Sequence, residues 1–145
     1  MIGMEIKKLF FDRKAVTAKV DRTTRKVLSR FGAFVRRAAK SSIARRKRVS
    51  SPGQPPSSHS GLLKKFIFFG YEPANRNVVI GPAKLNQKIG DAPHALERGG
   101  VSTVVEGLRG SRRKRRVKIK ARPFMGPAFN KEKPKLPAMW ASSIK

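Results

Sequence analysis

The densest group of ionisable side chains in this sequence is the run RGSRRKRRVKIKAR at residues 109–122, which contains no acidic residue. Such a run is suited to contact phosphates or acidic protein surfaces without reading bases, because it lacks interleaved aromatic residues and an Asn or Gln set. The bland alternative is a solvated loop tip whose charge keeps the protein soluble. We favour contact with a polyanion. The candidate residues are Arg109, Arg112, Arg113, Lys114, Arg115 and Arg116.

The overall charge points in the same direction. The 145 residues include 35 Lys and Arg against 8 Asp and Glu, a formal net charge of +27. A chain this basic is typical of proteins that bind nucleic acid or an acidic surface within an assembly.

There is no cysteine, which excludes disulfides and cysteine metal sites. The first residues contain no apolar stretch long enough for a signal peptide or a membrane span, so we expect synthesis in a cytoplasm.

Catalytic chemistry finds little support in the sequence. The only spaced pair is His94 and Glu97, three residues apart on a predicted short helix. Such a pair shares one helix face and could hold a metal, but without further ligands an ordinary surface or interface role is favoured. No glycine-rich phosphate loop is present. We therefore expect no enzymatic activity, no cofactor and no metal.

A long basic helix is predicted for residues 12–48. A helix of about 30 residues would be about 45 Å long and would end before Pro52. Its predicted apolar stripe, spaced by three, four or seven, consists of Val16, Val20, Val27, Phe31, Val35, Ala38 and Ser42 or Ile43. Most of the remaining surface carries the cations Arg13, Lys14, Lys19, Arg22, Arg25, Lys26, Arg30, Arg36, Arg37 and Lys40.

Two apolar segments, residues 62–71 and 77–81, are predicted to pair as an antiparallel hairpin around EPANR. Its first strand is unusually aromatic. A base-stacking platform is one interpretation, but strand core is the better one, since the rings lie at both parities and no second RNA-recognition motif is present. These aromatic residues are Phe66, Phe68, Phe69 and Tyr71.

The second half of the chain predicts further short elements. Residues 83–91 have the composition of an exposed loop, and residues 92–98 that of a short helix followed by glycine. Residues 101–108 and 115–121 are expected to pair around the turn Gly110-Ser111, with Val117, Ile119 and Ala121 facing a buried side. In the proline-broken tail a final helix is predicted near Pro137. Phe124, Phe129 and Trp140 are expected to pack the tail onto the sheet or a neighbour.

The spacer SSPGQPPSSHSG, residues 50–61, separates the basic helix from the strands and contains three prolines. We divide a single domain, residues 1–145, into the basic helix (1–49), this spacer arm (50–61), a region of strands (62–122) and a tail (123–145). A proline-stiffened arm stays extended at low entropic cost and is suited to lie on a neighbouring subunit. The candidate contact residues are Pro52, Gly53, Pro55 and Pro56.

Five short segments, taken in order, resemble the tail-completion or head-tail joining (neck) proteins of tailed bacteriophages. In that family a P-G-x-P-P loop, a T/S-G-x-L step, a V-x-V-G strand, an A-x-x-x-E-x-G segment and an R-P-F near the end follow one another. The resemblance covers nearly the whole chain. The matching positions are Pro52, Gly53, Pro55 and Pro56; Ser60, Gly61 and Leu63; Val78, Ile80 and Gly81; His94 to Gly99, with Glu97; and Arg122, Pro123 and Phe124.

The resemblance implies an α+β fold in which a long N-terminal amphipathic helix packs on a small, mostly antiparallel β-sheet, with a short helix and a C-terminal helical tail. It implies a virion structural protein in a ring, six subunits preferred and twelve next. The implied partners are portal or adaptor proteins, tail terminator or tail tube proteins, and double-stranded DNA in the lumen, contacted nonspecifically. No membrane is expected. The alternative is a ribosomal-type basic RNA-binding protein, which the charge alone supports equally well.

Overall fold

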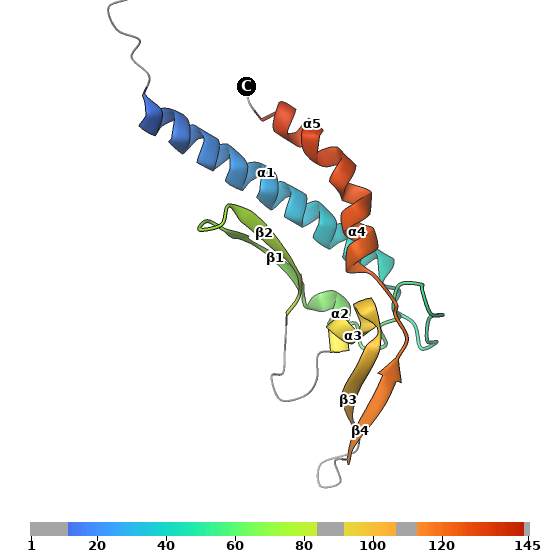
Figure 1. Cartoon of the computed structure of the whole chain (residues 1–145). Helices are drawn as coiled ribbons and strands as arrows, with labels where there is room; N and C mark the ends of the chain where they lie inside the picture. The colour runs from blue at the N-terminus through green and yellow to red at the C-terminus, as the bar shows by residue number, and fades with distance from the viewer. Residues whose placement is uncertain (1–11, 84–91, 107–112, 144–145) are drawn as a thin grey trace, which may run out of the picture.

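A computed structural model of the protein describes residues 12–83, 92–106 and 113–143 (Figure 1). The predicted α+β class, with a long N-terminal helix and antiparallel strands, is confirmed. The exposed loop predicted for residues 83–91 lies outside the described residues except for Ala83. The elements in chain order are α1 (Arg13–Ser42), α2 (Leu62–Lys65), β1 (Ile67–Glu72), β2 (Asn77–Pro82), α3 (Ala92–Arg98), β3 (Gly100–Glu106), β4 (Arg113–Ile119), α4 (Met125–Glu132), a 3-10 turn η1 (Lys133–Lys135) and α5 (Leu136–Ala141).

The long helix α1 organises the molecule. The Asp12 side chain caps its start by accepting a hydrogen bond from the Ala15 N–H at 3.0 Å. The helix ends at Ser42, earlier than the predicted limit of residue 48, because Ile43 turns to an extended conformation and fills the core with only 1% of its surface exposed. The helical period brings one stripe into the core, consisting of Val27, Phe31, Val35 and Ala39.

The β1–β2 hairpin packs on one side of α1 (Figure 1). Its antiparallel register runs from Ile67 opposite Pro82 to Glu72 opposite Asn77. Ile67 is fully buried, whereas Phe68, on the other face of the strand, is 48% exposed. The prediction that Phe68 belongs to the strand core is therefore wrong, since a two-stranded sheet packed on a single helix buries only one of its faces.

A short helix, α2, replaces the start of the first predicted strand. Gly61 precedes it in the left-handed conformation, with φ of 77°, which glycine adopts without a steric penalty. The turn of helix packs Leu63 against the core. A strand starting at residue 62 is thus incorrect, and β1 begins at Ile67.

Gly32 lets the hairpin approach α1 closely. A Cβ atom at this position would lie 2.8 Å from Val78 Cγ2 and 2.9 Å from Phe69 Cδ2. We expect Gly32→Ala to lower the free energy of unfolding by about 1–2 kcal/mol, because overpacking outweighs the better helix propensity of alanine. Denaturant unfolding measures this. Gly70→Ala, at a site with nothing within 4 Å, is the matched control, and an unchanged or higher stability for Gly32→Ala would contradict the close approach.

The second hairpin, the β3–β4 ribbon, forms a separate sheet. Its register runs from Gly100 opposite Ile119 to Glu106 opposite Arg113. The ribbon contacts α3 and projects away from α1 (Figure 1), so the single small sheet expected on the long helix is divided into two. Strand β4 begins two residues before the predicted position 115. Val117 and Ile119 are half-buried and alternate with exposed cations, because little of the domain covers the predicted buried face.

The C-terminal tail runs back along α1 in the opposite direction (Figure 1). The final helix predicted near Pro137 is confirmed as α5, but α4 was not predicted. Pro127 is tolerated there because the N–H groups of a first helical turn have no partner within the helix. The tail packs mainly on α1, where Phe129 meets Phe31 edge-on with ring centroids 5.8 Å apart, and Phe124 also joins the buried cluster that contains Ile67 of β1. Over the described residues, no helix combines the length and apolar character that a bilayer span requires.

Candidate nucleic-acid interface

Glu97 on α3 caps the start of α4. Its Oε2 accepts hydrogen bonds from the backbone N–H groups of Phe124 at 2.8 Å and Met125 at 3.0 Å, and its Oε1 accepts one from Gly126 at 2.7 Å. Phe124, the local cap residue, supplies no side-chain bond of its own. A carboxylate at this position accepts hydrogen bonds from N–H groups that have no partner within the helix, and its negative charge interacts favourably with the positive end of the helix dipole. Glu97 therefore has a structural role in the packing of α3 against the tail.

Three segments of the resemblance meet around this cap. Arg122 donates its backbone N–H to the Leu96 carbonyl at 2.6 Å, and its Nε donates to the Ser50 carbonyl at 2.9 Å. Gly53 donates its N–H to the Ala121 carbonyl at 2.9 Å. Each bond joins parts of the chain that are distant in sequence. We call the set Gly53, Glu97, Gly99, Arg122 and Phe124 the junction.

Gly99 and Phe124 complete the junction. Gly99 has φ of 77°, and a Cβ there would lie 3.2 Å from the Ala121 nitrogen. Only glycine fits easily between the end of α3 and the returning chain. Pro123 links Arg122 to Phe124, whose side chain is 1% exposed in the core. The remaining motif positions lie apart from the junction: Gly61 and Leu63 at α2, and Gly81 opposite Phe68 in the first hairpin.

The arm, residues 50–61, lies on its own domain at both ends. Ser58 donates its N–H to the Ala44 carbonyl at 3.0 Å, next to a parallel bridge between Ala44 and Ser57. Pro56 is buried and Pro55 is half-buried, whereas Pro52 and Gly53 at the tip are exposed. The Gly53 N–H at the tip is also bonded within the domain, to the Ala121 carbonyl, so contact with a neighbouring subunit remains a prediction for the exposed surface of residues 51–54.

The basic run at residues 109–122 is divided by the strand geometry of β4. Arg109 and Arg112 lie outside the described residues, whereas Arg113, Lys114, Arg115 and Arg116 are exposed on β4. Successive side chains of a strand point to opposite faces. Arg113 and Arg115 therefore lie on one face of the ribbon, and Lys114 and Arg116 on the other.

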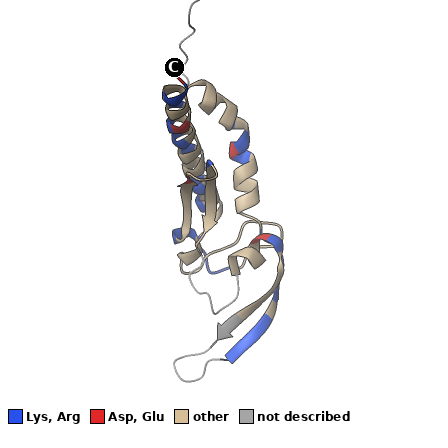
Figure 2. Ribbon diagram, turned by 60° about the vertical axis from the view of Figure 1, so that its left-hand side comes forward, with Lys and Arg blue, Asp and Glu red and all other residues tan. Residues whose placement is uncertain are grey.

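A second basic surface lies on α1, on the side opposite the core (Figure 2). The only acidic residue within the helix, Asp21, faces the β1–β2 hairpin, where Arg76 Nε lies 3.0 Å from its Oδ1. We name this surface the outer face of α1. Its members are Lys19, Arg22, Lys26, Arg30, Arg37 and Lys40.

Positive charge is most crowded at the C-terminal end of the outer face. Arg36 is held by a 2.7 Å hydrogen bond from its Nε to the Ile67 carbonyl, and its guanidinium carbon lies 6.0 Å from the centre of the Phe68 ring. Lys40 follows one turn later. Partial burial, and then the positive charges of Arg36 and Lys64, lower the pKa of the Lys40 ammonium. We call Arg36, Lys40 and Lys64 the end cluster. In the described parts of the chain, no carboxylate forms an ion pair with any of these three cations.

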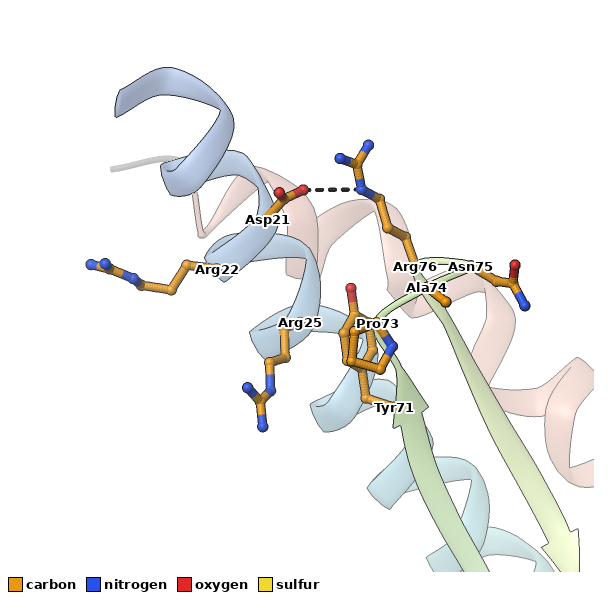
Figure 3. A pocket seen from close by; sticks show the side chains of 8 residues that line it. All are labelled: Asp21, Arg22, Arg25, Tyr71, Pro73, Ala74, Asn75 and Arg76. Carbon is orange, nitrogen blue, oxygen red and sulfur yellow. Dashed lines mark ion pairs between the residues drawn. The ribbon is translucent and has the colours of Figure 1, made fainter. Parts of the chain in front are cut away.

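An open pocket of about 620 Å³ lies between α1 and the turn of the first hairpin (Figure 3). Asp21, Arg22 and Arg25 contribute from α1, and Tyr71 and residues 73–76 form the other wall. The guanidinium groups of Arg22 and Arg25 extend away from the Asp21–Arg76 ion pair. The single carboxylate of the lining is thus engaged with an arginine, an arrangement that holds the hairpin turn against the helix.

The predicted His94–Glu97 pair is not assembled into a larger ligand set. Both carboxylate oxygens of Glu97 accept backbone hydrogen bonds from the tail, and His94 has an interaction of its own. Among the described residues, no three His, Cys, Asp or Glu side chains are grouped closely enough to hold a metal ion.

Comparison of the chain with protein-family models, curated proteins and solved structures found no match. The functional argument therefore rests on the residues themselves. Sequence reasoning missed the end cluster, although the four-residue spacing of Arg36 and Lys40 was a visible signal. Lys64 could not be added to it, because its segment was interpreted as a strand.

Proposed function

We propose that this protein is a ring-forming neck or tail-completion subunit of a tailed bacteriophage, which joins the head portal or connector to the tail around the DNA channel. The junction is the observation that carries the proposal. Three of the five motif segments, around Gly53, Glu97 and Arg122, are bound to one another or to shared neighbours although up to about seventy residues separate them. A chance set of short matches gives no reason for such contacts.

The shape of the domain supports an assembled state. Its two sheets have two strands each, and two-stranded sheets are marginally stable unless something packs on them. Val16 and Val20 on α1 are 43% and 53% exposed beside Trp140 of α5. Copies of the same chain in a closed ring would cover such edges and apolar side chains. Portal or adaptor proteins on one side and tail terminator or tail tube proteins on the other are the proposed partners, with the virion neck as location.

The purified protein is expected to form a closed ring, with six subunits preferred and twelve next. Sedimentation and negative-stain electron microscopy measure this, alone and with the adjoining neck proteins. Monomer under both conditions would overturn the proposal. A ribosomal-type RNA-binding protein, the alternative that the basic surfaces also suit, would instead remain with ribosomal RNA in a nuclease-sensitive complex.

A further inference from the structure

The outer face of α1 is an unusual surface for a helix that only meets solvent. Solvated helix faces usually mix charges of both signs, but here Arg22, Lys26 and Arg30 follow one another at four-residue spacing without an acid between them. Like charges at this spacing destabilise a helix. A bound polyanion would remove that repulsion, and the arrangement therefore favours a binding surface.

The dimensions of the outer face fit duplex DNA. From Lys19 to Lys40 the helix rises about 31 Å, close to the length of about 34 Å of one duplex turn. Cations recur along most of it every three or four residues, about 4.5–6 Å apart. A rigid row of this kind meets the closely spaced phosphates of DNA without base contacts.

The ribbon presents its charges less favourably. Lys114, Arg116 and Lys118 lie on one face of β4, and Arg113 and Arg115 lie on the other, so one duplex meets at most three of these five exposed residues. The outer face of α1 presents its cations on one side. Among the described residues, the outer face of α1 therefore offers more cations to one duplex than either face of the ribbon does.

The end cluster strengthens the argument. The Nε of Arg36 donates a hydrogen bond to the Ile67 carbonyl. Within the described chain, no group accepts a hydrogen bond from the terminal nitrogens of Arg36. A fixed guanidinium whose two terminal nitrogens are free is suited to bind phosphate bidentately through the edge between them. Lys40 and Lys64 add two ammonium groups whose mutual repulsion an anion would relieve.

We propose that the outer face of α1, together with the end cluster of Arg36, Lys40 and Lys64, is the surface of this subunit that binds the phosphates of double-stranded DNA. The inference rests on the proposed function, since it names which side of the subunit faces the channel.

Two charge-matched variants test this assignment. One carries Arg22→Gln, Lys26→Gln, Arg30→Gln and Arg37→Gln; the other carries Arg113→Gln, Lys114→Gln, Arg115→Gln and Arg116→Gln. Binding to a 30-bp duplex of random sequence is measured over a salt series. The helix variant should flatten the log-log salt slope by about 3–4 units per bound subunit and the ribbon variant by about 2 or less. An equal or larger effect of the ribbon variant would overturn the inference.

A smaller variant tests the end cluster. Lys40→Gln with Lys64→Gln is expected to weaken duplex binding about tenfold at physiological salt, through the loss of two phosphate contacts. Lys131→Gln with Lys133→Gln, two exposed positions near the end of α4, is the control and should change affinity less than about twofold. Equal effects of the two pairs would remove the end cluster from the site.

Ring assembly, duplex RNA and folding provide the remaining comparisons. If rings form normally but the helix variant binds DNA as tightly as the parent protein, this inference is overturned and the proposed function stands. If the protein binds DNA through α1 in a salt-dependent way but forms no ring, the proposed function is overturned and the assignment of the DNA-binding surface stands. Tighter binding of the parent to duplex RNA than to duplex DNA of equal length would replace DNA as the ligand. Circular dichroism must show unchanged helix content in the variants, which glutamine favours through its high helix propensity.

Discussion

Glu97→Ala is expected to lower the free energy of unfolding by about 2–4 kcal/mol, because three backbone N–H groups at the start of α4 lose the carboxylate that accepts their hydrogen bonds. Bonds to a charged acceptor are worth more than neutral ones, and the three share a single carboxylate, so their contributions do not simply add. Thermal unfolding should shift down by roughly 6–12 °C for a chain of this size. Circular dichroism and differential scanning calorimetry measure both quantities.

Two further variants isolate the cap. Glu97→Gln keeps one acceptor oxygen and should lose about half as much stability as Glu97→Ala. Glu72→Ala removes an acid that accepts a hydrogen bond from the Asn75 side chain in an exposed turn, and it should change stability by less than about 0.5 kcal/mol. If all three variants were equally stable, the carboxylate would not hold α4 in place.

Phe124→Ala is expected to lower the free energy of unfolding by about 3–5 kcal/mol, the usual range for removing a fully buried ring. The side chain is 1% exposed and lies in the cluster that joins α1, β1 and α4. The resulting void cannot collapse easily, because Val35 and Ile67 on neighbouring elements are also fully buried. Urea unfolding with a linear extrapolation measures the loss.

Phe68→Ala is the matched control, since the same ring is removed from a position that is 48% exposed. It should lose less than half of the stability lost at Phe124. The double variant Glu97→Ala with Phe124→Ala should be less destabilised than the sum of the single variants, because both act where α4 begins. Full additivity would mean that cap and ring stabilise separate parts of the domain.

The regular elements with strong patterns could be predicted from the sequence. The four-residue spacing of Val27, Phe31 and Val35 indicated α1, and Ala92–Arg98 was predicted with the same bounds as α3. The turn before Asn77 fixed the register of β1 with β2. In these segments, local propensity and tertiary packing favour the same structure.

The sequence-based predictions were wrong where tertiary contacts determine the conformation of a short segment. The run LLKKFIFF is compatible with a strand or a helix by its pattern, and the packing of Leu63 selects one helical turn before β1. Helix α4 contains Pro127 in its first turn. Its start depends on a cap from Glu97, which lies 28 residues before Met125 in the chain. No local pattern in the tail carries that information.

The candidate site was predictable in chemistry but not in geometry. Charge alone identified the basic run and the cationic side of the long helix. The division of Arg113 to Arg116 between two faces, and the effect of the Lys64 charge on the pKa of Lys40, follow only from the arrangement of the elements. Dense charge in a sequence therefore overstates how many residues can bind one partner.

The clamped base of the β3–β4 ribbon has a consequence for how such a subunit can vary. The chain leaves the body after Leu96 and returns at Arg122, and the bond between these two residues closes the excursion at its root. Closing a longer loop costs only about 0.6 kcal/mol for each doubling of its length. Changes in the length of the ribbon beyond Gly100 are therefore expected to cost the body little stability, because the bond at its root does not depend on that length.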